Sequence, residues 1–341
     1  MKVILDVMGG DNPPKEFVRG AVLAAKESDI NIVLVGDETI IKEALKASES
    51  DVDMARFEIV HAEEVITMED EPFAVLREKK NSSMAVALKL LADGKGDAFV
   101  GAGNTGAMFT GATMIVHSVK GIKRAAIATV MPFERPLLLL DAGANLNVTP
   151  DYLLQFAVMG EVYSHRVLGC EKPTVGLLNN GTEAHKGTQL VTETHKLLKD
   201  SSVNFIGNVE GKEVPYGKCD VLVTDGFTGN IVLKLSEGLS AFLMKKIKKL
   251  FMANLITKLS SVLFKKPLTS LKKEFSAKEY GGAPFLGIAK PVLKAHGNAD
   301  AETMKNAILK AKLYYETGII DEIAARAAAL AEQKKQTVAE Q

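Results

Sequence analysis

The sequence predicts an α/β protein built on a mainly parallel sheet with helices on both faces. Short apolar, often β-branched runs recur along the chain; a loop of Gly, Asp, Asn and Thr follows each run, and a helical pattern follows each loop. Such alternation is typical of parallel sheets that are buried on both faces. The chain shows no internal repeat and no flexible linker, so residues 1–341 are expected to form a single α/β domain.

Six strands are expected from the apolar runs. They cover residues 3–5, 32–35, 98–100, 137–140, 175–178 and 221–223. Ligands of such sheets bind beyond the carboxyl ends of the strands, which is where the glycine-rich loops of this chain fall. We therefore expect several of these loops to meet at one cleft.

Helices are expected between and after these strands. Pro14 near the start of one apolar period and Ser82 or Ser83 before another are typical of helix N-termini. The periodic segments are residues 14–26, 84–91, a helix starting near residue 231, 304–315 and 319–332. The tail, residues 334–341, is expected to be frayed.

Composition excludes several classes of function. Lys plus Arg and Asp plus Glu both number 42, so overall charge gives no support for nucleic-acid binding. Two cysteines and the absence of His-Glu-x-x-His and Cys-x-x-Cys patterns predict no disulfide framework, no metal and no cofactor. The N-terminus does not read as a signal peptide and no run reaches membrane-spanning length, so a cytoplasmic protein is expected.

Three loops contain side chains suited to binding an anion. Residues 101–107 read Gly-Ala-Gly-Asn-Thr-Gly-Ala, which fits either a phosphate cradle or a plain strand–helix turn. Residues 179–187 include Lys186, which offers a point charge to a phosphate or an oxyanion if the loop is more than a solvated turn. In residues 224–230, Asp225 or Thr228 suits a helix cap, whereas Asn230 lies where the helix departs.

A basic amphipathic stretch occupies residues 239–275. Residues 239–273 carry nine lysines and no acidic residue. Leu239, Phe242, Leu243, Ile247, Leu250 and Phe251 share one helical face, but the apolar face moves after Met252. We expect a kinked helix or a pair of helices that contacts an anionic membrane, a second subunit, or both.

Taken together, these loops resemble the PlsX family of phosphate acyltransferases. The matching segments follow the family's order over nearly the whole chain: residues 6–11, 80–84, 101–107, 141–145, 181–187, 224–230 and 280–287. Ala184-His185 departs from the family pattern, so no role transfers to His185.

The resemblance implies a three-layer α/β/α Rossmann-like fold, akin to phosphate acetyltransferases and isocitrate/isopropylmalate-type dehydrogenases. It implies transfer of a fatty acyl group from acyl carrier protein to inorganic phosphate, giving acyl phosphate for phospholipid synthesis. It also implies a homodimer that attaches peripherally to the inner face of the membrane and supplies an integral glycerol-3-phosphate acyltransferase of the PlsY type.

The loops and the resemblance together give a set of candidate site residues. Lys186 and Asn230 are the candidate catalytic pair, expected to steady phosphate and the oxyanion while phosphate attacks the thioester directly. The candidate phosphate and substrate contacts are Asp6, Gly9, Gly10, Asp11, Ser82, Ser83, Gly101, Gly103, Asn104, Thr105, Gly106, Asn145, Asn180, Asp225 and Thr228. The candidate membrane contacts are Leu250, Phe251, Leu255 and Leu259.

Two other functions remain as alternatives. A phosphate acetyltransferase acting on a coenzyme A thioester would use the same loops. A membrane-binding scaffold without enzymatic activity would explain the basic stretch but leave the glycine loops without a role. A dehydrogenase is disfavoured, because no strand-end acid follows the 101–106 loop at dinucleotide spacing.

Overall fold

Eleven strands form one sheet in the computed structural model, which describes residues 1–12, 14–48, 52–254, 264, 266–267 and 281–339. The first lobe contributes five parallel strands, in the order β3 (Phe57–His61), β2 (Asn31–Gly36), β1 (Lys2–Asp6), β4 (Ala98–Gly101) and β11 (Val292–Lys294). The second lobe contributes four parallel strands, in the order β6 (Pro136–Leu140), β9 (Val221–Val223), β7 (Val175–Asn179) and β8 (Phe205–Glu210).

Two antiparallel strands join the lobes. β10 (Ala283–Leu286) pairs with β11 and with β5 (Ala126–Pro132), and β5 then pairs with β6. All six predicted strands are present, and the prediction of a mainly parallel sheet is confirmed. β3, β5, β8, β10 and β11 were not predicted.

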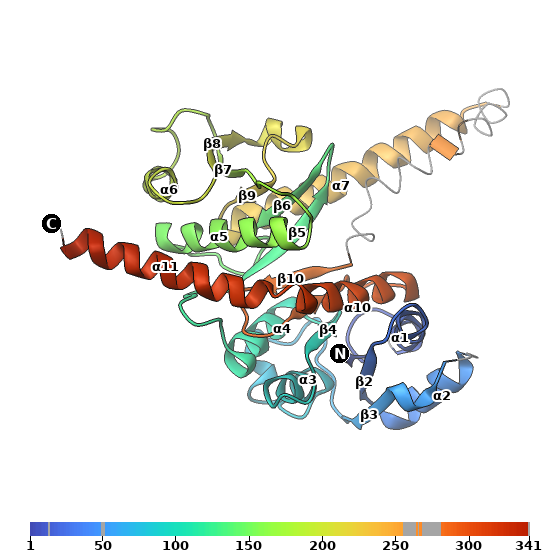
Figure 1. Ribbon diagram of the computed structural model, residues 1–341. Coiled ribbons are helices and arrows are strands. Elements are labelled where there is room, and N and C mark those ends of the chain that lie inside the picture. Colours follow the sequence, from blue (N-terminus) through green and yellow to red (C-terminus); the bar gives the residue numbers. More distant parts are fainter. Residues whose placement is uncertain (13, 49–51, 255–263, 265, 268–280, 340–341) are drawn as a thin grey trace.

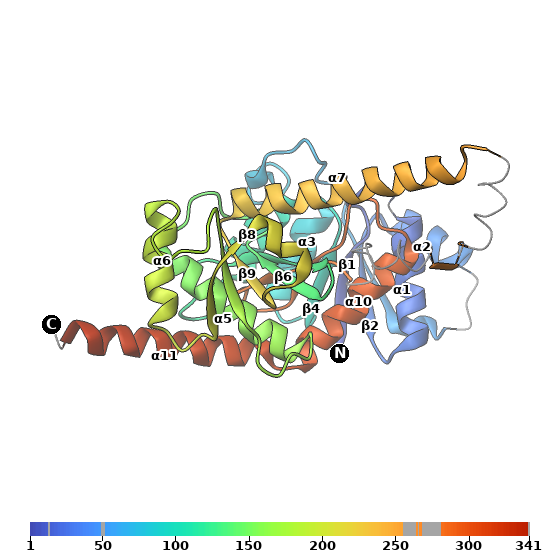
Figure 2. The same ribbon diagram turned by 90° about the horizontal axis from the view of Figure 1, so that it is seen from above.

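Helices cover both faces of the sheet (Figures 1 and 2). Packed on one face are α1 (Lys15–Glu27), α2 (Glu38–Ala47), α5 (Pro150–Arg166), α6 (Gln189–Lys199), α10 (Ala301–Glu316) and α11 (Ile319–Ala339). Packed on the other are α3 (Ser83–Ala92), α4 (Thr105–Gly111) with the π-helical turn η3 (Ala112–Val116), and α7 (Gly226–Phe251). Short 3-10 turns are η1 (Met54–Arg56), η2 (Pro72–Val75) and η4 (Gly211–Tyr216).

Two predicted helix boundaries are corrected. α7 begins at Gly226, not near Ile231, because Asp225 accepts a hydrogen bond from the Thr228 N–H and caps the helix five residues earlier. The backbone of α11 continues to Ala339 in the segment expected to be frayed. α7 ends at Phe251, close to the predicted break.

One half-buried lysine, whose ammonium group points into the protein, makes stability depend on pH. Lys310 of α10 donates a hydrogen bond to the Gly282 carbonyl oxygen at 3.1 Å and lies over the Tyr163 ring. Burial lowers the pKa of Lys310 from 10.5 to about 7. Because the unfolded chain binds this proton more tightly, the folded state loses stability as pH falls from about 10 to about 7.

Lys310→Met is therefore expected to weaken this pH dependence. The free energy of unfolding of the variant should exceed that of the wild type at pH 7, by on the order of 2 kcal/mol, and the gap should shrink toward pH 10. Denaturant unfolding at the two pH values measures this difference. A gap that is equal at both would show that the lysine keeps its ordinary pKa.

Candidate functional site

The loops that follow β1, β4 and β11 touch one another in the first lobe. A Cβ atom placed on Gly9 would lie 2.9 Å from the Cα of Gly103, so these two backbones are in direct contact. The Asp11 N–H donates a hydrogen bond of 2.7 Å to the Gly297 carbonyl oxygen. This group therefore brings together the predicted glycine loops at residues 9–11 and 101–106.

Three of the residues predicted to contact phosphate or substrate are buried in the protein interior. Asp6, Ser82 and Ser83 are all at most 1% exposed. Asp6 accepts the Met8 N–H at 3.0 Å, and burial raises the pKa of its carboxyl although the Ser83 hydroxyl and the Met8 N–H act against that rise. Ser82 caps α3 by accepting the Ala85 N–H. These side chains support the loops from the protein interior.

The side chain of Asn104 is also bound within the protein. Its Oδ1 caps α4 by accepting the Ala107 N–H at 3.1 Å, and its Nδ2 contacts the carbonyl oxygens of Thr67, Met68 and Asp70 at 2.9–3.3 Å. Both functional ends of the amide are thus engaged within the protein. The exposed Thr105 and the half-buried Gly106 follow at the start of α4.

The loop after β6 is shaped by a buried carboxylate. Asp141 is fully buried and accepts backbone N–H groups of Ile127, Gly143, Ala144 and Asn145 at 2.7–3.1 Å. It also accepts the Asn145 side-chain amide at 2.8 Å. Burial raises the pKa of Asp141, whereas these hydrogen bonds lower it. Asp141 therefore fixes this loop, and Asn145 is 7% exposed within it.

The start of α7 packs closely against that loop. The Gly226 N–H donates to the Asn145 carbonyl oxygen at 2.8 Å, and a Cβ on Gly229 would lie 1.9 Å from the Asp141 carbonyl oxygen. The Asp225 carboxylate accepts both the N–H and the hydroxyl of Thr228, so these two side chains form the N-terminal cap of α7. A helix cap is one of the two roles considered for them from the sequence; the other is a phosphate or substrate contact. Asn230 is exposed in the first turns of α7, and its side chain lies beside Gly143.

The loop after β7 presents Lys186 to solvent. Asn179 donates to the Lys186 carbonyl oxygen at 3.0 Å, and Asn208 of β8 donates to the Glu183 carbonyl oxygen at 2.9 Å. The side chains of Lys186 and Asn180 are exposed. β7 and β9 are paired, with Leu177 opposite Val223, so the loop that carries Lys186 and the helix α7 that carries Asn230 follow neighbouring strand ends.

Sequence reasoning missed the residues that hold the Lys186 loop. Asn208 contacts His195 of α6 through Oδ1 at 2.9 Å and reaches Glu183 through Nδ2. Asn208 and His195 lie on β8 and α6, and both elements follow the Lys186 loop in sequence. No local motif marks Asn208, because its role arises only when β8 pairs with β7.

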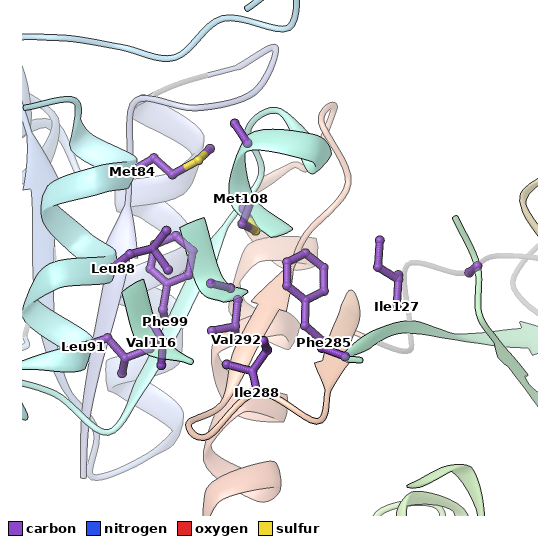
Figure 3. Packing of buried hydrophobic residues seen from close by; sticks show 14 of the residues in the cluster. Met84, Leu88, Leu91, Phe99, Met108, Val116, Ile127, Phe285, Ile288 and Val292 are labelled. Atoms are coloured by element: carbon purple, nitrogen blue, oxygen red, sulfur yellow. The ribbon is translucent and has the colours of Figure 1, made fainter. Parts of the chain in front are cut away.

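One buried hydrophobic cluster connects the loops of the first lobe with the loop after β6 in the second lobe. Ala142 and Ala144 of the loop after β6 reach the buried cluster that holds Met108 and Phe109 of α4. Figure 3 shows Met108, Phe285 and Ile127 along this shared cluster. The contact between residues 9–11 and 101–106 is present in the first lobe, whereas a single cleft shared with the loops of the second lobe stays a prediction.

Two cavities lie away from these loops. One of about 270 Å³ is lined by Asp97, Lys290, Tyr314, Tyr315 and Asp321, among others. The other, of about 40 Å³, lies between β5 and α7. Leu233 lines it, but Asn230 does not. Within the described residues, no group of three or more His, Cys, Asp or Glu side chains is arranged to hold a metal ion.

Comparisons with known structures agree with this architecture. A phosphotransacetylase from Streptococcus pyogenes superposes with a TM-score of 0.59 at 18% identity, covering 96% of this chain and 94% of that one. The EutD phosphotransacetylase from Staphylococcus aureus gives 0.58 at 16%, covering 92% and 94%. A 4-hydroxythreonine-4-phosphate dehydrogenase from Klebsiella pneumoniae gives 0.53 at 14%, covering 92% and 100%. The predicted fold class is confirmed.

Sequence comparison is more specific. The family model described as "Fatty acid synthesis protein" matches residues 1–322. Phosphate acyltransferases from Acetivibrio thermocellus and Brevibacillus brevis are 44% and 45% identical to this chain, over 95% and 94% of it and 95% of each relative. The chain therefore belongs to this fatty acid synthesis protein family and is an acyltransferase of the phosphate acyltransferase type.

Proposed function

We propose that this enzyme transfers a fatty acyl group from acyl carrier protein to inorganic phosphate and so forms acyl phosphate for phospholipid synthesis. The observation that carries the proposal is the placement of two exposed polar side chains beyond neighbouring strand ends: Lys186 lies on the loop after β7, and Asn230 lies in the first turns of α7, which follows β9. A cation and a carboxamide there suit a phosphate and a developing oxyanion. The helix that carries Asn230 continues into an exposed apolar surface suited to a lipid product.

In the proposed reaction, phosphate needs no activation by a protein nucleophile. A phosphate oxygen attacks the thioester carbonyl carbon, the tetrahedral oxyanion collapses, the carbon–sulfur bond breaks, and the carrier thiolate leaves and takes up a proton. Backbone N–H groups of the loop at residues 101–106 hold phosphate, while Lys186 and Asn230 steady the phosphate and the oxyanion. The absence of an acyl-enzyme fits Cys219, whose burial raises its thiol pKa to about 12.

The choice of acyl carrier tests this proposal. With phosphate as acceptor, acyl phosphate should form from acyl carrier protein loaded with a long acyl chain at a higher kcat/KM than from the matching acyl-coenzyme A. Preference for a coenzyme A thioester would favour the alternative, a phosphate acetyltransferase, whose fold this chain shares. No product from either carrier would favour a non-enzymatic membrane scaffold.

Two surfaces of α7 support the proposed assembly. Its stem exposes Ile231, Leu235 and Leu239 by 50–67%, and Lys234 there is paired with Glu237 at 2.9 Å. This neutral apolar stem suits a homodimer contact. Further along, the exposed Lys245, Lys246, Lys248 and Lys249 precede Leu250, which is 70% exposed, and this basic end suits an anionic membrane.

This arrangement would make the enzyme a cytoplasmic protein that attaches peripherally to the inner face of the membrane. There it would pass acyl phosphate to an integral glycerol-3-phosphate acyltransferase of the PlsY type.

Of the other predicted membrane contacts, Phe251 is half-buried, and its ring centroid lies 5.7 Å from that of Phe264. Leu255 and Leu259, also predicted to bind lipid, lie outside the described residues. No helix among the described residues is long and apolar enough to cross a membrane.

Changing Leu250 and Phe251 to glutamine is expected to release the enzyme from anionic vesicles while soluble activity persists. Each lost apolar side chain removes about 1.5–3 kcal/mol of burial, so vesicle partitioning should fall roughly tenfold or more. Vesicle co-sedimentation measures this partitioning. Leu235→Gln is the matched control: it should keep vesicle binding and weaken self-association in sedimentation equilibrium. Unchanged co-sedimentation with a weakened dimer for the Leu250 and Phe251 variant would assign the tip to the dimer contact.

A further inference from the structure

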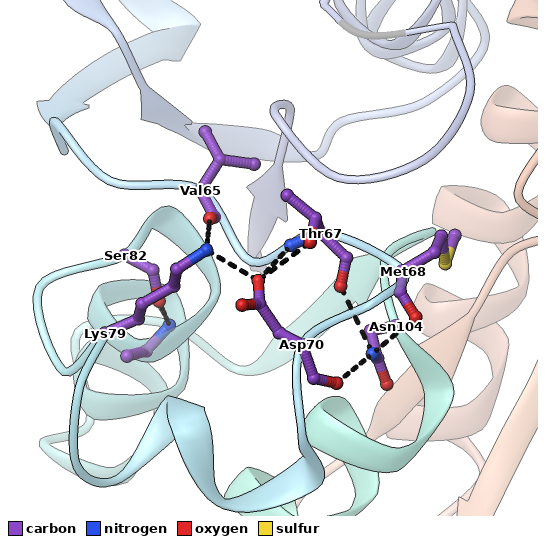
Figure 4. Close-up of polar contacts among 8 residues, drawn as sticks. Val65, Thr67, Met68, Asp70, Lys79, Ser82 and Asn104 are labelled. Carbon is purple, nitrogen blue, oxygen red and sulfur yellow. Dashed lines mark hydrogen bonds and ion pairs between the residues drawn. The ribbon is translucent and has the colours of Figure 1, made fainter.

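A turn in the first lobe is closed by one carboxylate. Asp70 Oδ2 accepts the Thr67 N–H at 2.6 Å and the Thr67 hydroxyl at 3.0 Å. The same oxygen accepts Lys79 Nζ at 2.6 Å, and Lys79 also donates to the Val65 carbonyl oxygen at 2.9 Å. Figure 4 shows these contacts gathered around Asp70. The lysine therefore ties both ends of this turn to the segment that leads into α3.

A second contact joins the turn to α4. Asn104 is 8% exposed, and its Nδ2 points at the carbonyl oxygens of Thr67, Met68 and Asp70, as Figure 4 shows. Pro72, just after the turn, packs on Gly106: a Cβ there would lie 3.0 Å from the Pro72 Cγ. The turn is thus fixed beside the loop proposed to hold phosphate.

The turn carries an exposed apolar side chain over the neighbouring loop. Met68 is 51% exposed, although its backbone is held by Asn104. A Cβ placed on Gly297 would lie 3.4 Å from Met68 Cε and 3.3 Å from Asp11 Oδ2. Met68 therefore lies close to Gly297 and Asp11, beside the loops that follow β11 and β1.

We propose that Asn104, Asp70 and Lys79 are positioning residues of the phosphate site. They hold the turn of residues 67–70 against residues 101–106 and keep Met68 beside Asp11, and they act through the turn without touching phosphate. The inference rests on the proposed function, because it takes the loop of residues 101–106 as part of that site. It reassigns Asn104, expected from the sequence to bind phosphate, as the residue that fixes the wall of the site.

Asn104→Ser and Lys79→Met test this role from the two sides of the turn. Serine caps a helix about as well as asparagine does, so α4 keeps its cap while the turn loses its amide donor. Both variants should raise the KM for phosphate roughly tenfold or more, because a displaced wall weakens ground-state binding of phosphate. The kcat at saturating phosphate and the midpoint of thermal unfolding should stay near the wild-type values.

Replacing Lys79 by arginine instead of methionine should keep the KM for phosphate near the wild-type value, because a guanidinium can also pair with the Asp70 carboxylate. Lys95→Met, which removes an exposed lysine beyond the other end of α3, should behave as wild type. An unchanged KM in both Asn104→Ser and Lys79→Met would overturn the inference, as would parallel losses of kcat and thermal midpoint without a change in KM.

A second measurement separates this inference from the proposed function. Inorganic phosphate should raise the midpoint of thermal unfolding of the wild type, and the same concentration should raise it less in Asn104→Ser and Lys79→Met. Equal shifts in all three proteins would overturn the positioning role even if the reaction is confirmed. A wild type that is stabilised by phosphate but forms no acyl phosphate would contradict the proposed function alone.

Discussion

Alanine at Lys186 or at Asn230 is expected to reduce kcat by roughly 10²–10³-fold and to leave the fold intact. Both side chains are exposed, and neither forms a side-chain hydrogen bond with the described part of the chain. Each replacement would remove one donor to the phosphate or to the oxyanion without disturbing the core. Initial rates with saturating acyl-loaded acyl carrier protein and phosphate measure the loss of kcat, and thermal unfolding measures whether the fold is intact.

His185→Ala is the matched control for Lys186→Ala. His185 is the preceding residue of the same loop and is also exposed, and no role is assigned to it. The control should keep wild-type turnover. Near-wild-type rates for both Lys186→Ala and Asn230→Ala would remove the two residues from the catalytic role, whatever the fold of the protein.

Gly229→Ala is expected to destabilise the protein by about 3 kcal/mol or more and to abolish most activity. The new methyl group would lie 1.9 Å from the Asp141 carbonyl oxygen, and neither backbone is a flexible side-chain end that can move away. α7 would have to shift from the Asp141 loop, and the adjacent Asn230 would shift with it. Denaturant unfolding and turnover of the same preparation measure the two effects.

Gly238→Ala provides the control within the same helix. A Cβ at Gly238 would meet no atom within 4 Å, so alanine there should stabilise α7 by about 0.5–1 kcal/mol through its higher helix propensity. Equal effects of the two substitutions would contradict the close packing of α7 against the Asp141 loop.

The sequence was most informative where local pattern alone decides the structure. Six buried strands could be predicted because their apolar runs are continuous, as in residues 137–140, which are fully buried in the sheet. β3 and β8 lie at the two edges of the sheet, and most of their residues are only partly buried, so their apolar pattern is a weaker signal. β10 and β11 have only four and three residues, and their pairing depends on partners distant in sequence.

The candidate site shows the same limit. The loops around Gly101, Lys186 and Asn230 could be found because glycine and polar residues follow apolar strands. The functions of individual side chains could not, because they depend on contacts across the chain. Asn104 contacts a turn 34–37 residues earlier in sequence, and Asp141 collects four backbone N–H groups. Both are polar residues in glycine loops, and only the fold shows that they support the site.

The central claim is that phosphate attacks the carrier thioester directly. It is tested most directly by measuring the release of carrier thiol from acyl carrier protein loaded with a long acyl chain, with and without inorganic phosphate. Direct attack by phosphate predicts that thiol release requires phosphate, that acyl phosphate forms in equal amount, and that the protein carries no acyl group by mass spectrometry. Thiol release without phosphate, accompanied by an acylated chain, would contradict direct attack. Absence of acyl phosphate when phosphate is saturating would contradict the proposed reaction itself.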